Sequence, residues 1–193
     1  MKVLVLYAHP SETSFNAALH RLILERLSAS GHTVDDCDLY AEGFDPCMSR
    51  AELLGYHDVP ANIEGVRPYV ERLRVADALV LSFPVWNFGY PAILKGFFDR
   101  VFLPGVSFRL VNGKVQPSLH NIGKVAAVTT YGGSRLRAML MGDPPRKQVK
   151  RILRLTVKPG ASVSYFAHYS MNLSTPHTRE SFMSKVAARM GAF

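Results

Sequence analysis

Five short runs of strand-like sequence alternate with segments of helical periodicity, and this alternation limits the possible folds more than any other feature. Strands buried on both faces read as nearly continuous apolar runs bounded by turn residues. The expected strands are Lys2–Ala8, His32–Leu39, Ala76–Phe83, Lys124–Thr130 and Ser162–His168. Strands that alternate with helices predict an α/β fold, in which right-handed crossovers place helices on both faces of a parallel sheet.

Helical spacing of apolar residues fills the intervals between these runs. In the first interval, Phe15, Leu19, Leu22, Ile23 and Leu27 recur along one face, and Thr13 or Ser14 is available as the N-cap. Further helices are expected at Glu64–Arg74, from Pro91 to Phe102, at Pro144–Leu155 and at Pro176–Met190, with one short helix inside the loop Asp45–Pro60. The usual order of five such strands is 2-1-3-4-5, which places ligands beyond the carboxyl ends of strands one, three and four.

Composition favours one compact domain, residues 1–193, because 48% of the 193 residues are hydrophobic. No apolar stretch approaches the roughly 20 residues that cross a bilayer, so no membrane span is expected. His9, Pro10 and Glu12 interrupt the N-terminal apolar run before a signal-peptide core forms, and we expect a cytoplasmic protein. Cys37 and Cys47 fit neither a disulfide framework nor a zinc site, so we expect reduced thiols and no metal.

The formal charge of +8 favours acidic partners but identifies none. Basic residues are scattered except in the segment Arg146–Arg154, for which a solvated helix face is the more common explanation. No arginine-rich tract or aromatic-interleaved strand resembles an RNA-binding signature, and we expect no nucleic-acid partner.

Three loops should converge at the carboxyl edge of the predicted sheet: His9–Asn16, Pro84–Pro91 and Thr129–Ser134. The first precedes a helix, whose free N–H groups and dipole favour a phosphate. Ordinary capping by Thr13 or Ser14 explains that loop equally well.

The second and third loops fit a planar ligand. Trp86, Phe88 and Tyr90 offer a flat apolar wall, with core packing as the alternative, and Gly132 and Gly133 permit close backbone approach, with a simple tight turn as the alternative. These loops contain no paired carboxylates, no nucleophile beside a base and no Walker-type lysine. The chemistry is therefore assigned to a cofactor, and no catalytic residue is assigned.

The stretch Pro84–Phe102, PVWNFGYPAILKGFFDRVF, resembles a signature of the NAD(P)H:quinone oxidoreductases, the DT-diaphorase-like branch of the flavodoxin-like fold. The similarity runs from Met1 to about Ser134. It implies a homodimer with a flavin at each subunit junction. It further implies that hydride passes from NADH or NADPH to the flavin and then to a quinone-type acceptor.

The resemblance also implies roles for particular residues. The first loop would hold the flavin phosphates, Pro84–Phe88 would line the ribityl chain and isoalloxazine edge, and amides near Gly132 and Gly133 would stabilise negative charge on the reduced ring. The implied cofactor-binding residues are His9, Thr13, Ser14, Phe15 and Asn16, then Pro84, Val85, Trp86, Asn87 and Phe88, and finally Thr129, Thr130, Tyr131, Gly132 and Gly133.

This chain departs from the family pattern at several positions. Arg135–Arg154 contains neither the Tyr nor the His found after the third loop in better-known members, so no proton relay is assigned. Tyr131 interrupts the usual Thr-Thr-Gly-Gly run, and Trp86-Asn87 replaces Gln-Trp. The C-terminal part is shorter than in mammalian-type members, which leaves FAD and FMN both open, while Ser14-Phe15-Asn16 favours FAD.

Several alternatives share these features. An azo- or nitro-compound reductase or a free-flavin reductase differs only in its acceptor. A flavodoxin-like electron carrier is usually acidic, so the charge of +8 counts against it. An ancillary subunit of a membrane transporter would use Arg146–Arg154 against an anionic surface. Arg135 and Arg137 suit the extra phosphate of NADPH, although solvated arginines are more common.

Overall fold

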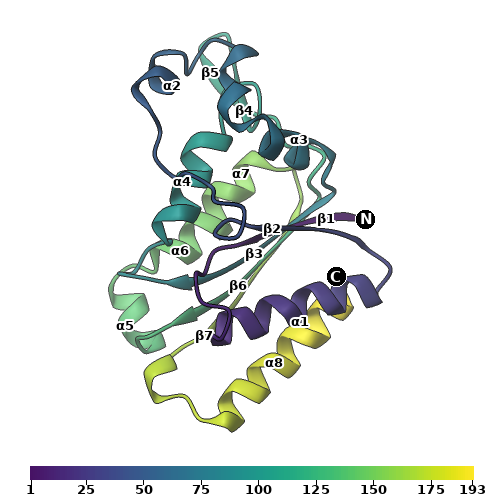
Figure 1. Ribbon diagram of the computed structural model, residues 1–193, viewed down its shortest axis with the longest axis vertical. Coiled ribbons are helices and arrows are strands. Elements are labelled where there is room, and N and C mark those ends of the chain that lie inside the picture. Colours follow the sequence, from purple (N-terminus) through teal and green to yellow (C-terminus); the bar gives the residue numbers. More distant parts are fainter.

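The computed structural model describes residues 1–193 and centres on a five-stranded parallel sheet. The strands are β1 (Lys2–Tyr7), β2 (Thr33–Asp38), β3 (Ala78–Val85), β6 (Lys124–Tyr131) and β7 (Ser162–His168). They lie in the order β2-β1-β3-β6-β7, and Figure 1 shows the sheet between two layers of helices. Counted among the parallel strands alone, this is the predicted order 2-1-3-4-5.

Helices cover both faces of the sheet. The helices α1 (Phe15–Ala29) and α8 (Pro176–Gly191) lie side by side on one face in Figure 1. The other face carries α3 (Arg67–Val75), α4 (Ala92–Val101) and a helical stretch from 144 to 156. Successive residues of β1 alternate between two apolar cores: Val3 and Val5 pack toward α1 and α8, whereas Leu4 and Leu6 pack toward α3 and α4. Burial on both faces explains why the inner strands β1, β3 and β6 are almost wholly apolar, whereas the edge strand β2 is partly exposed and carries three aspartates.

Several elements differ from the sequence expectation. The segment Pro144–Leu155 is not one α-helix: it comprises α6 (Pro144–Lys147), the π-helix η2 (Gln148–Leu153) and α7 (Arg154–Thr156). Strand β3 does not end before Pro84 but continues through Val85, pairing with β6. The remaining short helices are α2 (Arg50–Leu54), η1 (Ala61–Val66), α5 (Arg135–Leu140) and η3 (Met171–Leu173). Of these, α2 confirms the short helix expected within Asp45–Pro60.

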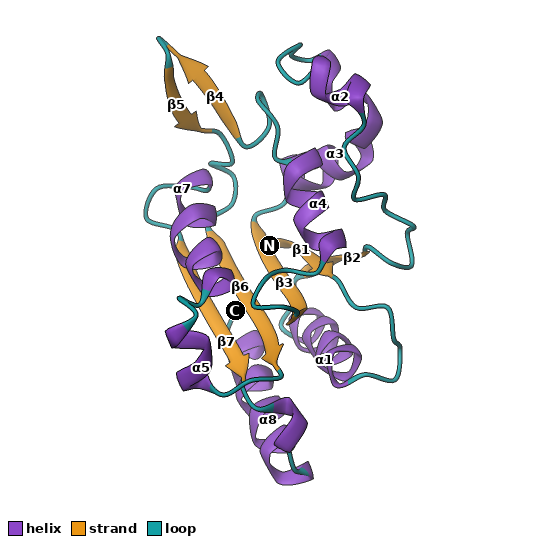
Figure 2. Ribbon diagram, turned by 90° about the vertical axis from the view of Figure 1, so that its left-hand side faces the viewer, coloured by secondary structure: helices purple, strands orange, loops and turns teal.

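An antiparallel hairpin that the sequence analysis did not predict joins α4 to β6. It pairs β4 (Phe108–Val111) with β5 (Lys114–Pro117) and stands apart from the main sheet in Figure 2. Asn112 and Gly113 form its turn with φ of 51° and 73°. Two positive φ values are the requirement of the tight hairpin turn that matches strand twist.

A close backbone contact fixes α4 against the segment before α2. A Cβ built on Gly96 would lie 2.3 Å from the carbonyl oxygen and 2.4 Å from the Cα of Pro46. Only glycine fits this position, because any side chain would require the backbone of the facing segment to move.

Candidate functional site

The three loops do converge at the carboxyl edge of the sheet. Strands β1 and β3 are bridged beyond their last paired residues by a hydrogen bond from Ala8 N to Ser82 O of 3.0 Å. Strands β3 and β6 remain in register through Pro84 opposite Thr130. The loops after β1, β3 and β6 therefore begin beside one another.

Ser14 caps α1 in the first loop, which decides between the two candidate caps. Its Oγ accepts a hydrogen bond from Ala17 N at 3.0 Å. Thr13 is exposed, with its hydroxyl 3.2 Å from that of Ser11. The first N–H groups of the helix, those of Phe15 and Asn16, have no acceptor within the helix and remain available to a ligand.

His9 is held as a neutral ring with a defined tautomer. Its Nδ1 accepts a hydrogen bond from Ser11 N at 3.0 Å, and burial lowers the pKa of the imidazole. At neutral pH the proton therefore sits on Nε2, which makes that atom a donor. The His9 ring lies edge-on to Trp86 with centroids 5.9 Å apart, so the first and second loops are in contact.

Asn16 connects the first loop to the third. Its Nδ2 donates to Thr130 Oγ1 at 2.9 Å, and this bond is buried. Asn16 Oδ1 and Thr129 Oγ1 are also buried, yet neither has a hydrogen-bond partner within the protein. Because a buried polar atom without a partner costs about 1–3 kcal/mol, each of these atoms marks a place where a polar ligand or water belongs, although the two side chains lie on opposite faces of the sheet.

The second loop is a tight turn with strained geometry. Trp86 and Gly89 exchange two backbone hydrogen bonds, of 3.2 and 2.8 Å. Asn87 and Phe88 between them have φ of 48° and 57°. Left-handed backbone at a bulky residue such as Phe88 costs on the order of 1 kcal/mol and is concentrated at ligand sites. Trp86 is 43% exposed, an unusual position for its large ring.

Two predicted site residues direct their side chains elsewhere. The Phe15 ring packs against His168 and Phe182, with centroids 5.6 and 6.5 Å away. Tyr131 is not a loop residue but the last residue of β6, and its buried hydroxyl donates to Asp143 Oδ1 at 2.6 Å. At both positions only the backbone faces the converging loops.

The sequence analysis missed the connection between β7 and α8 as part of this edge. Ser170 N donates to Gly133 O at 2.9 Å, and a Cβ on Gly132 would lie 3.6 Å from the Asn172 amide. The signal was present, because β7 is a parallel strand whose carboxyl end meets the same edge.

A family model described as a flavodoxin-like fold matches residues 1–186. The chain belongs to this family. It is 34% identical over 157 residues to NAD(P)H dehydrogenase (quinone) 1 of Cavia porcellus, covering 73% of this chain and 57% of that protein. The chain thus spans little more than half the length of the mammalian relatives it matches.

Solved structures support the same flavodoxin-like assignment. The NAD(P)H:quinone oxidoreductase from Methanothermobacter marburgensis superposes with a TM-score of 0.85 at 27% identity, covering 99% of this chain and 98% of that one. An FMN-dependent NADH-azoreductase from Bacillus anthracis, in complex with FMN, has a TM-score of 0.79, covering 99% and 98% of the two chains. Its 16% identity makes it a likeness of fold alone. The resemblance expected from the stretch Pro84–Phe102 is thereby confirmed.

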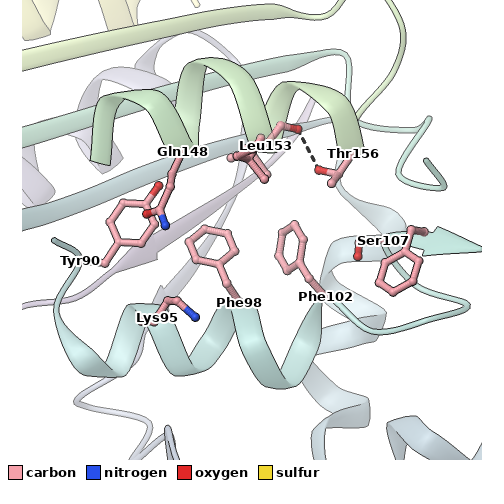
Figure 3. A pocket seen from close by; sticks show the side chains of 10 residues that line it. Tyr90, Lys95, Phe98, Phe102, Ser107, Gln148, Leu153 and Thr156 are labelled. Atoms are coloured by element: carbon pink, nitrogen blue, oxygen red, sulfur yellow. Dashed lines mark hydrogen bonds between the residues drawn. The ribbon is translucent and has the colours of Figure 1, made fainter. Parts of the chain in front are cut away.

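An apolar cavity of about 300 Å³ adjoins the second loop of this flavodoxin-like domain. Figure 3 shows Phe98 and Phe102 rising from α4 toward η2 and α7, with Tyr90 at one end. Leu153 and Gln148 close the cavity from η2. Tyr90 follows the strained turn directly, so one end of the cavity lies at the second loop.

None of the helices combines the length and the apolar composition that crossing a bilayer requires.

Proposed function

We propose that this protein is a flavin-dependent NAD(P)H oxidoreductase that passes two electrons to a quinone-type acceptor. The observation that carries the proposal is the convergence of the loops after β1, β3 and β6 beside the buried Asn16 Oδ1, which has no hydrogen-bond partner within the protein. The names of the relatives at 27–34% identity point in the same direction.

The residues at this edge fit a flavin. The free N–H groups of Phe15 and Asn16 and the Nε2 donor of His9 suit its phosphate, since a helix N-terminus favours an anion. The strained turn at Asn87 and Phe88 presents backbone N–H groups, and the exposed Trp86 ring offers a flat apolar wall. When bound, a flavin supplies the capacity to accept hydride from NADH or NADPH and deliver both electrons to an acceptor.

The role of the protein itself is to position the reactants, because the three loops contain no paired carboxylates and no nucleophile beside a base. Gly132 and Gly133 leave room for a ring to approach the backbone, whose N–H groups stabilise negative charge near them. The apolar cavity lined by Tyr90, Phe98 and Phe102 suits a flat, weakly polar acceptor such as a quinone.

A homodimer is part of the proposal. Large apolar side chains are exposed over α5 and the helical stretch after it, among them Leu136, Met139, Leu140, Ile152 and Leu155. Each is at least 60% exposed. Several large apolar side chains exposed on neighbouring helical segments are typical of a protein interface, and a second copy of the chain is the partner that the family resemblance implies. Sedimentation velocity measures this directly, and a monomer at all concentrations would refute it.

A titration tests the flavin. The purified protein is expected to be yellow, and anaerobic addition of NADPH or NADH is expected to bleach it without a detectable semiquinone. FAD and FMN both carry the required phosphate. Mass analysis of the released flavin then distinguishes FAD, which Ser14-Phe15-Asn16 favours, from FMN. A colourless protein that takes up neither flavin would contradict the proposal.

A matched pair of variants locates the flavin. Asn16→Ala removes an amide at the carboxyl edge and should weaken flavin binding about tenfold, as expected for one lost polar contact. Asn121→Ala removes an amide that bonds the Leu73 and Ala76 carbonyls at the opposite edge, and it should leave flavin affinity unchanged. Equal effects of the two substitutions would place the flavin elsewhere. Turnover with a quinone compared with an azo dye then identifies the acceptor class.

A further inference from the structure

A second cavity, of about 460 Å³, lies between α5, η2 and the end of β7 and is strongly basic. Five cations line it, Arg135, Arg146, Lys147, Lys150 and Arg151, against the single carboxylate of Asp143. Like charges gathered in one concavity repel one another, so such a site is stabilised by an anion that neutralises them.

Two of these cations are held within the protein. Arg146 donates from Nε to Asp143 Oδ2 at 2.9 Å and from a terminal nitrogen to the Tyr169 hydroxyl at 2.9 Å. Lys150 Nζ donates to the Val163 carbonyl at 2.6 Å. The Arg146 guanidinium also lies 4.7 Å from the Tyr165 ring centroid, so its orientation is fixed from three sides.

The other three cations have no partner in the chain. Neither Arg135, Lys147 nor Arg151 has a carboxylate within 4 Å or a side-chain hydrogen bond. Three free cations beside one fixed guanidinium form a ready set of donors for a phosphate group, which carries close to two negative charges at neutral pH.

The basic cavity adjoins the third of the converging loops. Arg135 is the first residue of α5, directly after the third loop. The Tyr169 ring packs 4.7 Å from that of Tyr131, the last residue of β6. A volume of about 460 Å³ is that of a small-molecule site, whereas nucleic acid and membranes require an extended basic surface.

We propose that this cavity binds the 2′-phosphate of NADPH and so selects NADPH over NADH as electron donor. The inference rests on the proposed oxidoreductase function and adds to it the identity of the donor. The sequence analysis considered Arg135 and Arg137 together as ligands of this phosphate. In the structure Arg135 lines the cavity, whereas Arg137 does not, and the Arg137 side chain lies against Gly133.

Calorimetric binding to the purified full-length protein tests the site without any turnover. Adenosine 2′,5′-bisphosphate should bind about tenfold more tightly than 5′-AMP, since the two differ only in the 2′-phosphate. The double variant Lys147→Gln/Arg151→Gln should lose this preference. Arg154→Gln, which removes a charge from the same helical stretch outside the cavity, should retain it. Equal affinities for the two nucleotides in the wild type, or an equal loss in Arg154→Gln, would overturn the inference, as would inorganic phosphate binding as tightly as the bisphosphate.

Steady-state kinetics separate this inference from the function on which it rests. In the flavin-loaded enzyme, the ratio of kcat/KM for NADPH to that for NADH should fall about tenfold in the double variant and stay constant in Arg154→Gln. Oxidation of both nucleotides with an unchanged ratio would refute the phosphate site and leave the oxidoreductase standing. Selective binding of the bisphosphate by a protein that oxidises neither nucleotide would support the phosphate site and refute the oxidoreductase.

Discussion

Replacing Tyr131 by Phe should destabilise the protein far more than the loss of one hydroxyl usually does. The hydroxyl donates to Asp143 Oδ1 at 2.6 Å and lies 2.6 Å from the Tyr165 hydroxyl. Because its only proton goes to Asp143, it must accept from Tyr165. Burial raises the pKa of Tyr131, so the donor stays protonated at neutral pH.

The magnitude follows from the two lost hydrogen bonds. The bond to the carboxylate contributes about 1.5–3 kcal/mol, and stranding the Tyr165 hydroxyl costs about 1 kcal/mol more. Asp143 keeps its ion pair with Arg146 at 2.9 Å, so the carboxylate is not left bare. We therefore expect the free energy of unfolding to fall by about 2.5–4 kcal/mol, equivalent to a Tm decrease of roughly 5–15 °C for a chain of this size.

Urea unfolding followed by far-ultraviolet circular dichroism measures the effect, with Tyr165→Phe as control. That variant loses only the hydrogen bond between the Tyr165 and Tyr131 hydroxyls, and its free energy of unfolding should fall by about 1 kcal/mol. The double variant should cost no more than Tyr131→Phe alone, because the hydrogen bond between the two hydroxyls is already lost there and no stranded Tyr165 hydroxyl remains. A Tyr131→Phe variant no less stable than Tyr165→Phe, or strictly additive effects, would refute the assigned chain of donors.

Three further outcomes are expected. Gly96→Ala should lower the free energy of unfolding in urea by roughly 1–3 kcal/mol, because the added Cβ would overlap backbone atoms of Pro46. Gly191→Ala, whose Cβ would meet open space, should be neutral, and equal stabilities of the two variants would contradict the close contact. In the native protein iodoacetamide should label the exposed Cys47 and spare Cys37, whose thiol pKa is raised by burial, with both labelled in denaturant; native labelling of Cys37 would be the contrary result. Burial lowers the pKa of His168, so the unfolded chain takes up a proton before the folded protein does as the pH falls below about 6.5, and the free energy of unfolding declines there. His168→Gln should flatten that decline between about pH 7.5 and 5.5, and an unchanged slope would count against this assignment.

The sequence predicted the sheet well because burial on both faces leaves a direct trace in composition. Runs such as Leu79–Leu81 can be little else than buried strand. The hairpin around Asn112 and Gly113 was not predicted, although Asn-Gly is the strongest short hairpin signal, because its short, half-exposed strands lie outside the alternation of strands and helices that builds the parallel sheet.

At the site, convergence of the loops was predictable from topology, but side-chain direction was not. Tyr131 looked like a loop residue because it precedes two glycines, yet β6 continues through it and its side chain follows the strand alternation toward Asp143. The basic cavity could not be predicted either, because Arg135 and Arg151 are sixteen positions apart in the sequence and only the fold brings them together.

The π-helix η2 has a consequence for how this protein and its relatives can change length. Hydrogen bonds in such a segment close over five residues rather than four, so Gln148–Leu153 accommodates one residue more than an α-helix spanning the same distance. Deleting a single residue there would restore a regular α-helix while keeping the elements on either side in phase. The same deletion in α4 or α8 would rotate everything after it by about 100°. Natural variants and engineered libraries can therefore lose a residue in this stretch while the elements on either side of it keep their places in the fold.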